Sequence, residues 1–146
     1  MSLTQLVAAR LKLKVSGLGM VGDAADLASI RRETLQFPAA FVVLLADKGG
    51  QNGLNSGNSV SQRREQRLGV VLAVRNIRSG QGADALHEID ALRQQVDAAL
   101  IGWQPGTGDT YDPVLFSAGK LLDMSNGEMW WQDEYLTAYQ YWKANS

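Results

Sequence analysis

The chain has 146 residues, of which 45% are hydrophobic and 20% charged, and its formal net charge is −1 at pH 7. This length and composition predict one globular domain, 1–146, and the near-neutral charge excludes a general attraction to nucleic acid. The chain has no cysteine, which excludes disulfides and thiolate metal sites, and none of its apolar runs approaches the ~20 residues that a transmembrane helix needs.

Two helices are predicted in the first part of the chain. The first has apolar residues at helical spacing, with Ser2 or Thr4 as a possible N-cap; these residues are Leu3, Leu6, Val7 and Leu11. The glycine-rich stretch 16–22 is interpreted as a link. Asp23 is a good N-cap for a second, short helix.

The middle of the chain contains two apolar runs that predict buried strands. These runs, 39–46 and 68–74, lack the alternation of a half-exposed strand, so we expect both faces of each to be covered and the second to be a central strand. The polar stretch 62–67 continues the second strand and is expected to project beyond the core, into solvent or onto a partner. Between the two runs, 47–59 is predicted to be a long hairpin connection in the form of a solvated loop, or else an arm that becomes ordered on a partner.

A long helix and a terminal hairpin follow. The apolar positions of 83–101 recur at three and four residues, which predicts an amphipathic helix that ends at Gly102. Asn126-Gly127 before the aromatic-rich stretch 128–142 predicts a β-hairpin, although that stretch also fits helical spacing. The expected fold is therefore α+β: a mixed, mainly antiparallel sheet flanked by two or three helices, with a C-terminal β-hairpin.

One motif points weakly to chemistry. The stretch from Gly17 to Gly22 matches G-x-G-x-x-G before a short helix, an arrangement that can bind a pyrophosphate. However, Asp23 would place a negative charge where the phosphate should lie, so glycines that serve a loop are the favoured interpretation. His87 is the only histidine and is expected at the surface. We therefore predict no catalytic, cofactor or metal site, and a protein that is not an enzyme.

Other unusual residues are candidates for contacts with other proteins. If 62–67 is a strand, Arg63 and Arg67 share one face and Arg64 lies on the other; a solvated strand extension is the alternative. The tryptophans of the last strand either cover the helices or form a subunit interface, where aromatic residues are enriched. The predicted assembly interface consists of Arg63, Arg64, Arg67, Asn52, Asn55, Trp130 and Trp131.

The order of these segments is similar to that of a known family. The segments that carry the likeness are Pro38-Ala39-Ala40-Phe41-Val42-Val43, Val60-Ser61-Gln62, 69–76, 92–100, Gly102-Trp103-Gln104-Pro105, Gly119-Lys120-Leu121 and 130–139. From Leu3 to Tyr141 the chain resembles the tail terminator proteins of long-tailed bacteriophages.

The resemblance implies a structural role without catalysis. Tail terminators form hexameric rings that cap the tail tube, end its polymerisation and provide the head–tail joining surface. The implied partners are further copies of the chain, the tail tube protein and the head–tail connector protein, with neither membrane nor sequence-specific nucleic acid, although DNA can pass through the ring. The implied location is the head-proximal end of the virion tail, and the host cytoplasm during assembly.

Two alternatives stay open at this point. The first is a tail-completion or head–tail connector subunit, which also forms oligomers but binds on the portal side. The second, less favoured, is a small nucleotide-binding enzyme that uses Gly17 to Gly22.

Overall fold

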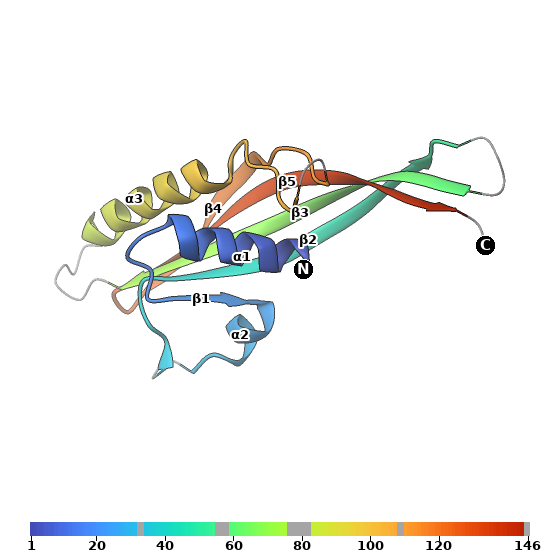
Figure 1. The fold of residues 1–146 in the computed structure, drawn as a ribbon. Helices are drawn as coiled ribbons and strands as arrows, with labels where there is room; N and C mark the ends of the chain where they lie inside the picture. Colours follow the sequence, from blue (N-terminus) through green and yellow to red (C-terminus); the bar gives the residue numbers. More distant parts are fainter. Residues whose placement is uncertain (32–33, 55–58, 76–82, 108–109, 145–146) are drawn as a thin grey trace.

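The computed structural model describes residues 1–31, 34–54, 59–75, 83–107 and 110–144. These residues form a sheet with the strand order β1-β2-β3-β5-β4, together with helices on both of its faces (Figure 1). The elements are α1 (Leu3–Lys14), β1 (Met20–Asp23), α2 (Ala24–Ser29), β2 (Ala39–Asn52), β3 (Ser59–Arg75), α3 (Ala83–Leu100), β4 (Leu115–Ser125) and β5 (Glu128–Ala144).

The helices divide the core into two layers. Helices α1 and α3 cover one face of the sheet, and α2 lies against the other (Figure 1). The first layer contains Val7 and Leu11 of α1, which pack with α3 against Leu68 and other alternate residues of β3. The second layer is smaller and is built around Phe41. Alternation along β3 thus supplies both layers, because successive side chains of a strand point to opposite faces.

The sheet confirms the predicted mixed, mainly antiparallel architecture. Strand β1 pairs with β2 in parallel, and all the other pairings are antiparallel. The C-terminal hairpin turns at Asn126 and Gly127, whose φ angles of 54° and 73° are the positive values that such a turn requires. The stretch 128–142 is strand and not helix, and β3 is the central strand, as predicted.

The residues predicted to cap or end helices do so in the structure. Ser2 caps α1 in a capping box with Gln5, and Asp23 caps α2 in a second box with Asp26. Gly102 has a φ of 84°, which fits its predicted role at the end of α3.

Three interpretations of the sequence were wrong in part. The stretch 16–22 is not only a link, because its last residues belong to β1. The stretch 47–59 does lie between two strands that pair in antiparallel register, as a hairpin requires, but much of it is strand instead of loop: β2 runs on to Asn52 and β3 begins at Ser59. The expected burial of 39–46 on both faces also stops early, since Leu44 and Leu45 are 44% and 38% exposed.

A buried tyrosine predicts how stability depends on pH. Tyr135 is fully buried and donates a hydrogen bond of 2.6 Å to Asp97 Oδ1. Burial, reinforced by this hydrogen bond, raises the pKa of the phenol above its ordinary value of 10.0. A raised pKa contributes stability that is present below the unfolded pKa and is lost as the pH rises above it.

We therefore expect Tyr135→Phe to flatten the alkaline limb of the stability curve. Above about pH 10 the parent chain should lose about 1.4 kcal/mol more per pH unit than the variant, because one proton fewer is bound in the unfolded state. Urea unfolding at successive pH values measures the difference. Tyr141→Phe is the control, because this tyrosine is 38% exposed. Equal alkaline slopes for the parent chain and Tyr135→Phe would contradict the prediction.

Candidate assembly surface

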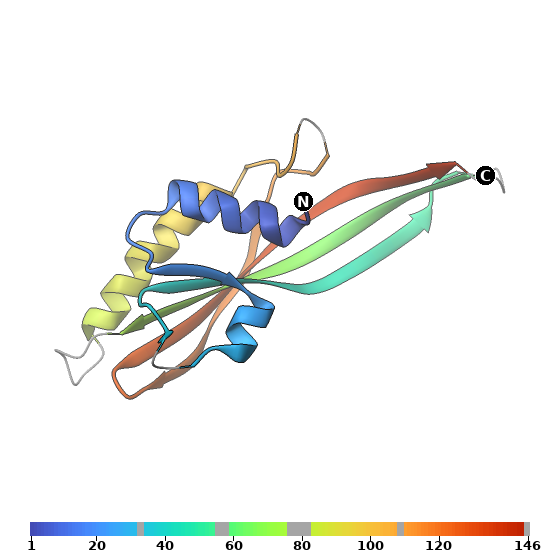
Figure 2. The same cartoon turned by 60° about the horizontal axis from the view of Figure 1, so that its bottom comes forward.

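Three strands continue past the helices and form an arm. We define the arm as residues 46–52 of β2, 59–67 of β3 and 136–144 of β5. Its pairing is continuous along β3, from Ser59 opposite Ala144 to Arg67 opposite Leu136, with β2 on the other side. Figures 1 and 2 show the arm extending away from α1, α2 and α3, which confirms that 62–67 projects beyond the core. A ribbon that no described helix covers has little core of its own.

Each predicted interface arginine has an acidic partner within the same chain. Arg63 forms an ion pair of 2.6 Å with Asp112, and Arg67 one of 2.9 Å with Glu134. Arg64 pairs with Asp47 and lies over the ring of Tyr139, 5.5 Å from its centroid. The hydrogen bond to Asp47 is the main cause that raises the pKa of Arg64. The charges of these arginines are therefore neutralised within the chain, and their ion pairs stabilise the arm.

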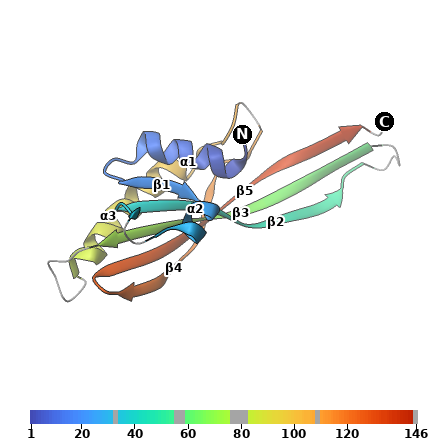
Figure 3. The same cartoon turned by 90° about the horizontal axis from the view of Figure 1, so that it is seen from below.

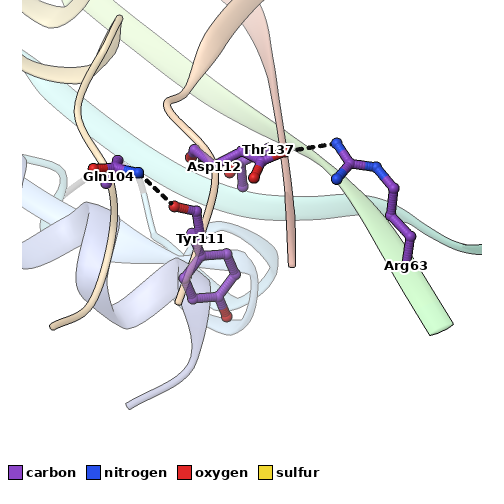
Figure 4. A network of polar contacts seen from close by, with 5 residues as sticks. All are labelled: Arg63, Gln104, Tyr111, Asp112 and Thr137. Atoms are coloured by element: carbon purple, nitrogen blue, oxygen red, sulfur yellow. Dashed lines mark hydrogen bonds and ion pairs between the residues drawn. The ribbon is translucent and has the colours of Figure 1, made fainter. Parts of the chain in front are cut away.

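The pair of Arg63 belongs to a network at the base of the arm (Figure 4). Thr137 Oγ1 donates a hydrogen bond of 2.7 Å to the carbonyl of Asp112, whose amide donates one of 2.8 Å to the carbonyl of Ala138. Tyr111 packs edge to face on Tyr139, with 5.3 Å between ring centroids. The segment before β4 thus fixes the outer side of β5 where the arm begins.

Of the two asparagines in the predicted interface, only Asn52 lies within the described residues. Asn52 Oδ1 accepts hydrogen bonds from the amides of Ser61, at 2.9 Å, and Leu54, at 3.2 Å. Its amide group donates to the carbonyl of Ser59 at 3.3 Å. Asn52 therefore holds the ends of β2 and β3 together. Asn55 lies outside the described residues.

The two tryptophans pack on opposite faces of their own sheet. Trp130 stacks on Phe41, with 6.2 Å between the ring centroids. Trp131 lies under Arg93, 4.6 Å from the centroid, and donates a hydrogen bond of 2.9 Å to Asp133. Both are half-buried, so this packing fits the interpretation that they cover the core. Their role in an interface stays a prediction.

Sequence reasoning missed the exposed apolar side chains. Strand β4 exposes between 41% and 59% of five of them: Leu115, Phe116, Leu121, Leu122 and Met124. On the arm, Trp142 is 64% exposed and Tyr141 is 38% exposed. Clustered exposed apolar residues indicate a binding surface. The sequence offered two signals for these side chains: the consecutive residues Leu121-Leu122, and the position of Trp142 far from the apolar runs. Neither signal shows by itself that a side chain is exposed.

The glycine motif is explained by close packing of the backbone. A Cβ atom at Gly19 would lie 2.8 Å from the carbonyl oxygen of Gln36, and one at Gly22 would lie 2.9 Å from Asp26. The helix that follows has only six residues, and two carboxylates lie at its start: Asp23 Oδ1 accepts from the amide of Asp26, and Asp26 Oδ2 accepts from the amide of Asp23. These carboxylates place negative charge where a pyrophosphate would have to bind, which favours the interpretation that the glycines serve the loop.

The structure also answers the questions about the single histidine, a metal site and a membrane-spanning helix for the described residues. His87 is exposed on α3, as predicted. Within the described ranges, no group of three His, Asp or Glu side chains could hold a metal ion. No described helix is both long and apolar enough to cross a membrane.

Comparison with known proteins adds one strong match. The sequence model of a family described as phage tail terminator protein matches residues 1–145. No curated protein is similar to the chain at a significant level. One similar solved structure covers 97% of this chain and 99% of its own, at 12% sequence identity and a TM-score of 0.41, a likeness too low to carry an argument.

Proposed function

Because this chain belongs to the phage tail terminator family, and is therefore a structural component of a phage tail, we propose that it assembles into a ring on the tail tube. The ring, a homohexamer at the head-proximal end, ends tube polymerisation and offers the surface to which the head–tail connector joins. DNA passes through it without being read. Assembly takes place in the host cytoplasm.

The arm is the observation that carries this proposal. Its three strands leave the core, and its exposed aromatic residues include Trp142. An isolated monomer gains little from such an extension, because apolar side chains there stay in water. Buried against another copy or the tube, the same side chains stabilise an assembly, and aromatic residues are typical of such interfaces.

Mass measurement and tube capping together test the proposal. Light scattering on a sizing column, over a concentration series, should detect a species near 95 kDa, about six copies of 15.9 kDa. Added to polymerising tube protein, the chain should shorten the tubes and be found at their ends. A protein that stays monomeric and leaves tube length unchanged would contradict the proposed function.

Reversing two arm charges should weaken assembly and leave the monomer folded. In Arg63→Glu with Arg67→Glu, both ion pairs become repulsions with Asp112 and Glu134, so the base of the arm is displaced. The arginine side chains are 52% and 41% exposed, and exposed pairs are worth at most about 1 kcal/mol each to stability. We expect the ring of this variant to dissociate at a concentration at least ~10-fold higher than the ring of the parent chain. The reason is that like charges disfavour a contact between subunits.

The control reverses the same amount of charge elsewhere. Lys12→Glu with Lys14→Glu changes exposed residues of α1, away from the arm. Light scattering gives the dissociation concentration, and circular dichroism verifies folding. The arm would have no part in assembly if both double variants formed rings as readily as the parent chain.

A further inference from the structure

The sheet has two long stretches of unpaired edge. Strand β4 is one outer strand, and in the described chain only β5 pairs with it. On the other side, β1 pairs only with the part of β2 from Ala39 to Val42. The outer side of β2 is therefore unpaired from Val43 to Asn52 among the described residues, as Figure 3 shows along the arm. An unpaired edge is a template for another strand.

Both edges carry exposed apolar side chains. Strand β4 exposes the five residues named above and has only Lys120 and Asp123 as charged residues. On β2 the unpaired stretch includes the exposed Leu44 and Leu45 and continues into Asp47 and Lys48, so each edge offers one positive and one negative charge. Soluble monomers usually protect their edges with charge and shortness, and these edges are long and apolar.

The strand directions allow the two edges to meet. Strand β4 is antiparallel to β5, β5 to β3, and β3 to β2, so β4 and β2 run in opposite directions. A second copy placed beside β4 in the same orientation thus presents its β2 in antiparallel sense. Because the two edges are different surfaces, the contact is heterologous, and repeated contacts close into a ring when the rotation allows it.

The register requires a shift between neighbouring copies. Within one copy, Lys120 of β4 is level with Gln132 of β5, Val71 of β3 and Phe41 of β2. Phe41 lies in the part of β2 that β1 occupies, and the middle of the unpaired stretch is near Asp47. The neighbour must therefore move along the strands by about six residues, roughly 20 Å. A stagger with tilted strands is what closes a sheet into a barrel.

We propose that β4 of one copy pairs with residues 43–52 of β2 in the next copy, so that the subunits share one continuous antiparallel sheet. This inference rests on the proposed ring function and names its subunit contact. In this arrangement the arm of each copy lies along β4 of its neighbour. The exposed leucines of both edges then lie beside side chains of the neighbouring copy on the same face of the sheet.

The absence of natural cysteine makes a cross-linking test clean. Leu122→Cys on β4 is combined with one cysteine at a time from Val43 to Gly50 of β2. The two strands of one copy are separated by β3 and β5, about 14 Å in all, which is too far for a disulfide. Oxidation should therefore give a ladder of linked subunits for the pair in register, ending at the ring size. Single-cysteine variants can give dimers at most.

A matched control separates specific pairing from random collision. Leu122→Cys with His87→Cys places the second thiol at an exposed position of α3, and it should give no ladder. Each variant is measured first in its reduced form, by native mass. Intact rings with no ladder from any of the pairs would overturn the shared sheet and leave the ring function standing. A chain that neither forms rings nor caps tubes would overturn the proposed function itself, and this contact with it.

Discussion

Arg93→Met should lower the free energy of unfolding by about 3–5 kcal/mol, because it removes the partner of a buried charge. The carboxylate of Asp133 is fully buried and accepts a hydrogen bond of 2.9 Å from Arg93 Nε. Its second oxygen accepts one of 2.9 Å from Trp131. The hydrogen bond with Asp133 is the main cause that raises the pKa of Arg93. Without the guanidinium, the carboxylate would keep only one of its two hydrogen bonds.

Two further variants test whether the buried charge of Asp133 causes the loss in the free energy of unfolding. Arg63→Met removes an exposed pair, with side chains 52% and 50% exposed, and should cost at most about 1 kcal/mol. Arg93→Met with Asp133→Asn removes the charge as well and should recover part of the loss. Urea unfolding at pH 7 measures all three. Equal losses for Arg93→Met and Arg63→Met would show that burial of Asp133 does not decide the effect.

Trp142→Ala should weaken assembly by about 2 kcal/mol or more per contact, or roughly 30-fold, if the arm binds a neighbouring copy or the tube. The side chain is 64% exposed in the monomer and sits near the end of the arm, where Trp142 pairs with Ser61. Its removal should change the free energy of unfolding by no more than about 0.5 kcal/mol. The loss would therefore be visible in assembly alone.

Leu13→Ala is the matched control for this loss. Leu13 is 75% exposed at the end of α1 and lies away from the arm. Dissociation concentrations from light scattering, and the fraction of capped tubes, are compared for both variants. If Trp142→Ala and the parent chain dissociate at the same concentration, the tip of the arm makes no important contact.

The sequence predicted the elements whose signals are local. Ser2, Asp23 and the Asn126-Gly127 turn act through neighbours a few residues away, so their roles follow from residue type and spacing. The strand character of 47–52 could not be predicted in this way. Its glycine-rich sequence disfavours a strand, and it becomes one because 62–67 supplies the pairing partners. Strand β1 was missed for a related reason, since only its pairing with β2 makes four residues a strand.

The candidate surface was predictable only in part. Strand alternation correctly separated Arg64 from Arg63 and Arg67, but the partners of the latter two, Asp112 and Glu134, are 49 and 67 residues away in the chain. No local pattern indicates such distant partners. The apolar residues of β4 look in sequence like those of a buried strand, and only the tertiary structure shows that they face water.

The position of β5 makes its synthesis a condition for building the arm. Strand β5 follows β4 in the chain but inserts between β3 and β4, and Ala144 pairs with Ser59, the first residue of β3. Strands β2 and β3 precede β5 in the chain, so they can meet before β5 has been synthesised. A chain interrupted before β5 would lack one side of the arm and would leave β3 open. Only chains that include β5 therefore present the complete arm, so a product that stops earlier would lack this proposed contact surface.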